Sequence, residues 1–245
     1  MNDPLLDIPN ELNPQSDWWV REFNDLACCS RAREIAEYEG HTLRIGVGGG
    51  DHESKGRALA TRSQLRRLCI DGRNIPQPLI NATGELPELQ RLQLGFIGNR
   101  SLLPLASLAN LESLSLEGVK GDQRLSIGDL SSLRTAWIGG DSDAVVSLVR
   151  EDNTTIRNLA LGGLPSANLK LQDLTFLSRF PKIEHLILLN VSVKSRSLAP
   201  CLGLQNLKQV TVNYVRRWDR DSVETLREKG VTVRSRMDEI NSQSV

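Results

Sequence analysis

The stretch Leu111-Glu112-Ser113-Leu114-Ser115-Leu116 decides the fold, because its spacing of apolar residues recurs along most of the chain. An apolar residue is followed by two free positions, a second apolar residue, one free position and a third apolar residue. The first apolar residue of each unit falls at positions 65, 89, 111, 133, 156, 183 and 207, so the period is 22 to 27 residues. A period in this range is typical of a solenoid, in which each unit packs only on its neighbours.

Each unit predicts one strand. Successive side chains of a strand point to opposite faces, so the apolar positions should point into the core and the residues between them outward. The pairs Leu43 with Ile45 and Val231 with Val233 extend the pattern at both ends and predict nine strands in all. Between the strands, Pro104 and Pro200 permit only about a turn of helix, whereas residues 142–150 and 219–229 predict fuller helices.

The N-terminal part predicts a cap for the solenoid. Residues 1–16 are rich in Pro, Asn and Asp and predict an irregular lead-in, and a helical pattern then runs from Asp17 to about Glu39. A terminal unit must cover the apolar end of the first repeat, although a separate binding helix is the alternative. We therefore expect a lead-in and capping helix over 1–39, the repeat domain over 40–233 and a polar tail over 234–245.

The composition limits which classes of partner and which cellular compartment the sequence favours. Lys plus Arg and Asp plus Glu both number 30 in the 245 residues, so no overall charge favours nucleic acid or an anionic membrane. The start lacks the basic and apolar regions of a secretory signal, which predicts a cytoplasmic protein. Cys28, Cys29, Cys69 and Cys201 form neither a disulfide framework nor a metal-binding spacing, and we expect buried thiols, no metal and no cofactor.

The glycine-rich segment from Gly46 to Gly56 is the place to consider catalysis. A phosphate-binding loop requires Gly-Lys-Ser/Thr after a fixed gap, but Lys55 lies between Ser54 and Gly56. Asp51, His52 and Glu53 could perform acid–base chemistry, although no base is paired with a nucleophile. We expect a flexible connection on the convex or rim side and no enzyme, and keep catalysis by residues 46–56 as a remote alternative.

The stretch 105–116 resembles the short, 22-residue class of the leucine-rich repeat family, which is found in bacterial and cytoplasmic eukaryotic members. The resemblance covers roughly residues 40–233. It implies an α/β solenoid, a horseshoe with a parallel sheet on its concave side and short helices or turns outside. One position departs from the family: the Asn expected three residues after the last strand leucine is missing in all seven units, so the turns must satisfy their backbone groups differently.

The concave face supplies the candidate binding residues. Uncharged side chains are expected there too, open to solvent, among them Ser113, Ser115, Thr135, Ala160, Ile187, Gln209 and Thr211. Aromatic residues and Arg are frequent interface anchors. The residues expected to contact a partner, on the concave face and the C-terminal rim, are Arg67, Arg91, Gln93, Phe96, Glu117, Trp137, His185, Tyr214, Arg216, Arg217 and Trp218.

Two of these predictions have a structural alternative. Trp137 stands outward in mid-sheet, where it either contacts a partner or folds over its neighbours' small side chains and shields the sheet. Arg216, Arg217 and Trp218 either contact a partner or place a cation on Trp218 as part of the cap.

The interpretation as a whole is a non-enzymatic module that binds another protein. Resemblance to free-standing bacterial members suggests an immunity protein that sequesters and neutralises a toxin or effector. The alternative is an adaptor or scaffold that recruits a client to a signalling or ubiquitin-ligase assembly, since residues 6–12 faintly resemble the opening of an F-box.

Overall fold

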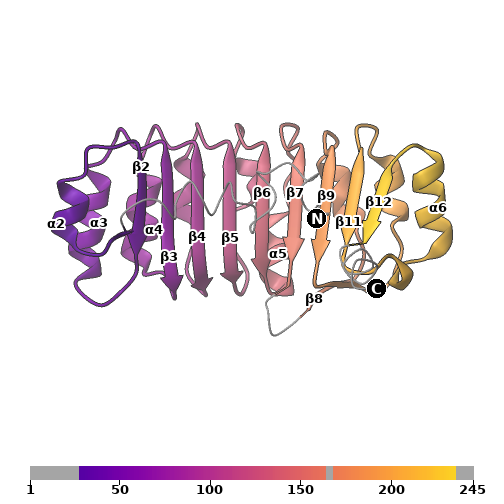
Figure 1. Cartoon of the computed structure of the whole chain (residues 1–245), viewed down its shortest axis with the longest axis horizontal. Helices are drawn as coiled ribbons and strands as arrows, with labels where there is room; N and C mark the ends of the chain where they lie inside the picture. Colours follow the sequence, from indigo (N-terminus) through magenta and orange to yellow (C-terminus); the bar gives the residue numbers. More distant parts are fainter. Residues whose placement is uncertain (1–27, 164–167, 236–245) are drawn as a thin grey trace, which may run out of the picture.

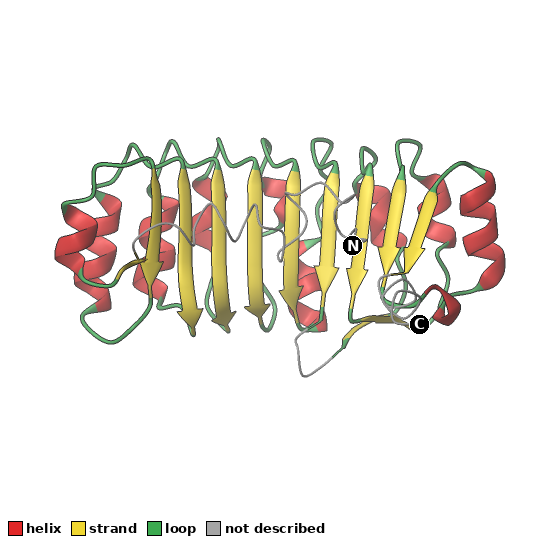
Figure 2. Cartoon of the chain, viewed as in Figure 1, coloured by secondary structure: helices red, strands yellow, loops and turns green. Residues whose placement is uncertain are grey.

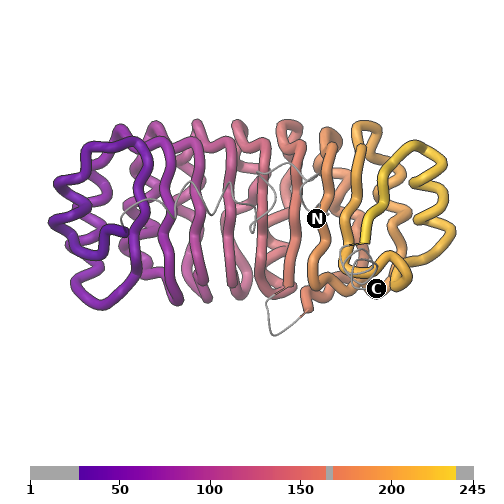
Figure 3. Tube along the Cα trace, viewed as in Figure 1, coloured from indigo at the N-terminus to yellow at the C-terminus, as the bar shows by residue number. Residues whose placement is uncertain are grey.

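Ten strands form one parallel sheet whose spatial order follows the sequence (Figure 1). The computed structural model describes residues 28–163 and 168–235. Successive strands lie side by side because each turn of the chain places its strand next to the preceding one, as in a solenoid (Figure 3). The predicted leucine-rich repeat solenoid is confirmed.

The main sheet contains all nine predicted strands and one that was not predicted. Its strands are β1 (Cys28–Cys29), β2 (Thr42–Gly46), β3 (Arg67–Arg73), β4 (Arg91–Gly98), β5 (Ser113–Val119), β6 (Thr135–Gly140), β7 (Asn158–Gly162), β9 (His185–Leu189), β11 (Gln209–Val212) and β12 (Thr232–Ser235). A separate two-stranded sheet pairs β8 (Leu169–Leu171) with β10 (Val191–Val193). Positions 234 and 235, predicted to belong to the polar tail, instead complete β12.

One apolar core runs the length of the molecule. The second apolar position of every unit stays in register from strand to strand, as Leu92, Leu114, Ala136, Leu159, Leu186 and Val210 show. These six side chains have no exposed surface. Full burial of such an aliphatic side chain stabilises the fold by roughly 1.5–3 kcal/mol, so the repeated ridge is the main source of stability.

The helices pack on one face of the ten-stranded sheet and at its two ends (Figure 2). α2 and α3 lie at one end of the row of strands, and α6 lies at the other. The α-helices are α2 (Ala32–Ala36), α3 (His52–Ala60), α4 (Gln77–Gly84), α5 (Ser142–Leu148) and α6 (Arg220–Glu228). The short 3-10 segments are η2 (Leu103–Ser107), η3 (Ile127–Asp129), η4 (Thr175–Arg179), η5 (Ala199–Gly203) and η6 (Val215–Arg217).

The prediction of one helix from Asp17 to Glu39 is wrong in the described part of the chain. Cys28 and Cys29 instead pair with Arg44 and Ile45 of β2, and only residues 32–36 are helical. Strand β1 satisfies backbone groups that the edge of β2 would otherwise leave unpaired, and this tertiary contact outweighs local helical pattern. Trp19, Phe23 and Leu26 lie outside the described residues.

The glycine-rich segment is also more ordered than predicted. Residues 52–60 form α3 rather than a flexible connection, and the Asp51 carboxylate caps this helix by accepting a hydrogen bond from the Ser54 amide at 3.1 Å.

Backbone groups of the turns are satisfied without an Asn ladder. At the carboxyl ends of the strands the turns bond to each other directly, for example Lys120 N to Gly98 O at 3.0 Å. At the opposite edge, a polar residue just before the first apolar position reaches back one repeat. The Asn110 amide donates to Pro87 O at 2.9 Å, and Ser132 Oγ donates to Ala109 O at 2.6 Å.

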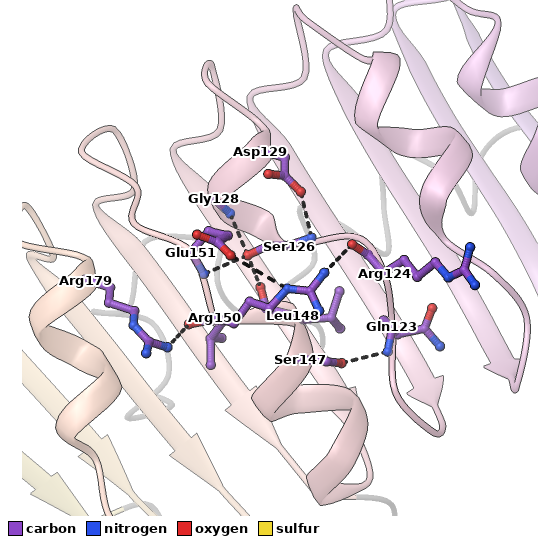
Figure 4. A network of polar contacts seen from close by, with 11 residues as sticks. Gln123, Arg124, Ser126, Gly128, Asp129, Ser147, Leu148, Arg150, Glu151 and Arg179 are labelled. Carbon is purple, nitrogen blue, oxygen red and sulfur yellow. Dashed lines mark hydrogen bonds and ion pairs between the residues drawn. The ribbon is translucent and has the colours of Figure 1, made fainter.

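A polar network on the helix side joins three neighbouring repeats (Figure 4). Ser126 is fully buried, and its hydroxyl donates to Leu148 O at 3.1 Å while it accepts from the Glu151 amide at 3.1 Å. The backbone amide of Gln123 donates to Ser147 Oγ at 2.8 Å, and the Arg179 guanidinium donates to Val149 O at 3.2 Å. These bonds pair buried polar groups where the three-residue η3 is followed by the longer α5.

Candidate functional site

The candidate site lies on the side of the ten-stranded sheet that faces away from the helices, which we call the sheet face. Strand register fixes which side chains are neighbours there. One row consists of Arg67, Arg91, Ser113, Thr135, Asn158, His185 and Gln209. The next row consists of Cys69, Gln93, Ser115, Trp137, Ala160, Ile187 and Thr211.

Charges gather in the N-terminal half of the sheet face. Arg67 and Arg91 are register neighbours, and partial burial, followed by the like charge of Arg91, lowers the pKa of Arg67. Arg44 Nε donates to Asp71 Oδ2 at 3.0 Å, and this bond raises the pKa of Arg44. Partial desolvation, followed by the charge of Asp71, raises the pKa of Glu117, although its side chain keeps solvent contact. This half of the face therefore presents both signs of charge.

Gln93 and Phe96 lie on the same strand and remain half-buried. The Phe96 ring lies against Gly118, which has a φ of +61° and has no room for a Cβ. Lys120 Nζ lies 5.9 Å from the centre of the Phe96 ring, within the range of a cation–π contact. Phe96 also lies at the point where the register between β4 and β5 shifts.

Trp137 adopts the shielding arrangement. Its indole packs against a small apolar cluster of Ala160, Ile187 and Leu189, and a Cβ on Gly162 would meet the indole Cζ2 at 3.2 Å. The side chain keeps part of its surface exposed. Its contact with a partner stays a prediction.

The expectation that the whole face is open to solvent is wrong at its central positions. Ser113, Ser115, Thr135, Ala160, Ile187, Gln209 and Thr211 are all exposed by 8% or less. Ser115, for example, lies in register between the longer side chains of Gln93 and Trp137, which screen it. The side chains of the face that keep exposed surface include Arg67, Arg91, Gln93, Phe96, Glu117 and Trp137.

A series of side-chain hydrogen bonds links the three strands β6, β7 and β9 on the sheet face. Asn158 Nδ2 donates to Thr135 Oγ1 at 3.1 Å, and Asn158 Oδ1 lies 2.9 Å from His185 Nδ1. Burial lowers the pKa of His185, while the charge of Glu184 opposes this effect. A hydrogen on His185 Nδ1 that is donated to Asn158 Oδ1 satisfies these hydrogen bonds.

The C-terminal rim brings the remaining candidates together around a cavity of ≈450 Å³. Arg217 and Arg216 lie 4.5 Å and 5.3 Å from the ring centre of Tyr214. The alternative interpretation placed a cation on Trp218 as part of the cap. Arg216 and Arg217 lie over the Tyr214 ring, and Trp218 packs against the main core. Arg196, which was not among the predicted residues, lines the same cavity from the loop after β10, and the local sequence carries no signal of this position.

The glycine-rich segment lines a second cavity of ≈600 Å³ together with His52, Asp71 and Arg73. Lys55 is only 2% exposed, and its Nζ donates to Gly48 O at 3.0 Å. The Lys55 ammonium therefore holds its own loop in place. The Nδ1 atom of His52 is buried without a hydrogen-bond partner in the described chain.

The thiols differ in their surroundings. Cys69 and Cys201 are buried, as expected, but Cys28 is exposed and Cys29 is half-buried, so the expectation of four buried thiols is wrong. Among residues 28–163 and 168–235, no group of three or more His, Cys, Asp or Glu side chains could hold a metal ion. No helix in these ranges is long and apolar enough to cross a membrane.

Comparison with known proteins finds structural similarity alone. No family model matches the chain, and no curated protein matches it. An internalin C2 from Listeria monocytogenes has 17% identity and a TM-score of 0.42, with 65% of this chain and 69% of that one covered. An internalin F from the same species has 17% identity and a TM-score of 0.43, with 83% and 63% covered.

A leucine-rich repeat protein from Leptospira interrogans has 14% identity and a TM-score of 0.44, with 86% and 58% covered. This chain therefore spans less than two thirds of the length of two of these three proteins. The fold assignment itself rests on the strand order and the register described above.

Proposed function

From the premise that this chain has the leucine-rich repeat fold, we propose that it is a non-enzymatic module that binds another protein on its sheet face. The observation that carries the proposal is the register, which aligns charged, amide and aromatic side chains on one continuous face. Among residues 28–163 and 168–235, the helices pack on the other face and at the ends (Figure 2), so the described helices leave this face open to a partner.

The dimensions of the face suit a protein partner. Ten strands about 4.8 Å apart span roughly 43 Å, and a strand of six residues is about 20 Å long. The area is therefore roughly 860 Å², close to the ~800 Å² that each partner buries in a typical specific complex. Charges of both signs favour a partner with complementary charges, because such complementarity supplies specificity.

The test is site-specific photocrosslinking in lysate of the source organism. A photoreactive residue at Gln93, Glu117 or His185 should crosslink one and the same protein. Matched controls on the helix side are Leu103 and Val146, whose side chains are 46% and 55% exposed. Crosslinks from the two control positions alone, or different proteins from each sheet-face position, would contradict the proposal.

Within this function we favour an immunity protein that acts by covering a toxin or effector in the cytoplasm. Such a role needs only a stable, complementary surface. Co-expression with the product of a neighbouring gene should relieve the toxicity of that product. Glu117→Lys should abolish the relief, whereas Glu112→Lys, an exposed position outside the strands, should preserve it. Equal protection by both variants would place the binding surface elsewhere.

The second candidate is an adaptor that holds two proteins at once, and it is motivated only by the sequence of residues 6–12. A photoreactive residue at Leu6 distinguishes the two candidates. Crosslinking of a second, different protein at Leu6 while Gln93 crosslinks the first would favour the adaptor.

A further inference from the structure

We propose that the cavity at the C-terminal rim is an anion site that takes a carboxylate-bearing, acidic segment of the partner protein. We call it the rim pocket; the residues that define it are Asn190, Arg196, Asn213, Tyr214, Arg216 and Arg217. This inference rests on the proposed function and adds the chemistry of the partner.

Three arginines supply the positive charge. Arg216 and Arg217 both lie within 5.3 Å of the Tyr214 ring centre, which keeps the two cations together at one wall of the cavity. Arg196 lines the same cavity, and all three side chains are exposed. A guanidinium beside a ring retains its N–H donors, and these match the two oxygens of a carboxylate.

No acid in the described chain neutralises this charge. The described residues that line the cavity include no Asp or Glu, and none of the three arginines forms an ion pair with a described residue. Asp219 is next to Trp218 in sequence, but its carboxylate caps α6 by accepting from the Ser222 amide at 3.0 Å. Other arginines do have partners, for example Arg157 with Glu184 at 3.2 Å. Residues 28–163 and 168–235 therefore supply no counter-charge to the rim pocket, although they do supply one to other arginines.

The backbone around the rim pocket is fixed. The Asn190 amide donates to Asn213 Oδ1 at 2.7 Å, and Asn213 Nδ2 donates to Asn190 Oδ1 at 3.1 Å. Arg196 has a φ of +50°, which a residue other than glycine keeps only where its surroundings enforce it. Here the Asp219 amide donates to Arg196 O at 2.7 Å. A preorganised site loses less entropy when it binds.

Size and charge favour a peptide over a nucleic acid. A cavity of ≈450 Å³ falls in the range of about 300–1,000 Å³ typical of small binding sites. It admits a few side chains of a partner. A nucleic acid backbone requires a stripe of cations, but here three cations share one cavity and the chain as a whole has no net charge.

The test is fluorescence anisotropy of the full chain with a rhodamine-labelled oligoglutamate peptide, compared with the oligoglutamine peptide, at low salt. Oligoglutamate should bind and oligoglutamine should not. Arg216→Glu with Arg217→Glu should weaken binding at least tenfold. Arg100→Glu with Arg134→Glu changes the net charge equally at exposed positions outside the pocket and should leave binding within twofold. Arg196→Glu alone should also weaken binding, which covers the case of a double variant that fails to fold.

Equal loss in both double variants would show attraction to the whole chain and would overturn the proposal. Tighter binding of an oligothymidine than of oligoglutamate would overturn it in favour of nucleic acid. A tenfold gain in affinity with Asp238→Asn and Glu239→Gln would make the chain's own tail the occupant. If oligoglutamate fails to bind while Gln93 still crosslinks a partner, only the rim pocket is refuted and the proposed function stands.

Discussion

At the scale of single residues, the sheet face is held by contacts between neighbouring strands. The Thr135, Asn158 and His185 side chains show this well, because each comes from a different repeat and each satisfies the next. This set of hydrogen bonds requires a hydrogen on His185 Nδ1, which Asn158 Oδ1 accepts.

His185 predicts a specific pH dependence. Its pKa is lowered by burial, so the folded state binds fewer protons than the unfolded chain once the pH falls below about 6.5. The stability that the neutral ring supplies is present above that pH and is lost as the pH falls through the lowered pKa. Urea unfolding of the parent protein and of His185→Gln at pH 7 and pH 5 measures this. A parent protein no more acid-sensitive than the variant would contradict the assignment.

Trp137 should contribute to stability. Its indole packs against Ala160, Ile187 and Leu189 while part of it stays exposed. Removal of a half-buried aromatic side chain should lower the free energy of unfolding by about 1–3 kcal/mol. Thermal or urea unfolding of Trp137→Ala measures the change. An unchanged stability would mean that the indole serves the partner alone.

The thiols should react at very different rates. Burial raises the pKa of Cys69 and of Cys201 to about 12, and the thiolate is the reactive form, so both should be inert in the native protein. Cys28 is exposed and should react first. Mass spectrometry after brief treatment with a thiol reagent identifies the modified residue. Fast modification at Cys201 would contradict the burial.

At the scale of elements, the close approach between adjacent repeats on the helix side depends on glycine. A Cβ on Gly56 of α3 would meet Pro78 O of α4 at 2.9 Å, and a Cβ on Gly84 of α4 would clash with Pro104 O of η2. Both opposing atoms belong to the backbone, which cannot move aside as a side chain can.

Gly84→Ala should therefore lower the free energy of unfolding by about 1–3 kcal/mol, as overpacking usually does. Gly203→Ala is the matched control, because a Cβ there would meet nothing within 4 Å and its φ is not in the left-handed region. Urea unfolding of both variants gives the comparison. A neutral Gly84→Ala would mean that α4 and η2 separate easily.

At the scale of the whole molecule, the solenoid should unfold locally when one rung is broken. Leu114 has no exposed surface and lies between Leu92 and Ala136 in register. Leu114→Asp buries a charge without a partner, so the middle of the sheet should open. Hydrogen exchange should show the loss of protection in β4 to β6 before the ends.

Leu103→Asp is the control, because this leucine is 46% exposed on η2. The substitution should leave the exchange pattern and the stability within about 0.5 kcal/mol of the parent protein. A folded, fully protected Leu114→Asp protein would refute the common ridge.

The repeat architecture is the part that the amino-acid sequence determined by itself. The fixed spacing of apolar residues determines which side of each strand is buried, and this information is contained within each repeat unit. The helix over residues 142–148 was predictable for the same reason, since Asp141 caps it and Ala144, Val145 and Leu148 face the core.

Only the tertiary structure decided which side chains of adjacent repeats contact one another. Examples are the pairing of β1 with β2, the packing of the Trp137 indole against Ala160, and the cavity that Arg196 shares with Arg216. Each brings together residues about 20 positions apart. A spacing pattern specifies burial along one strand, but the fit between side chains of adjacent strands depends on shape and charge in three dimensions. The candidate face was therefore predictable from the sequence, and the arrangement of side chains on it was not.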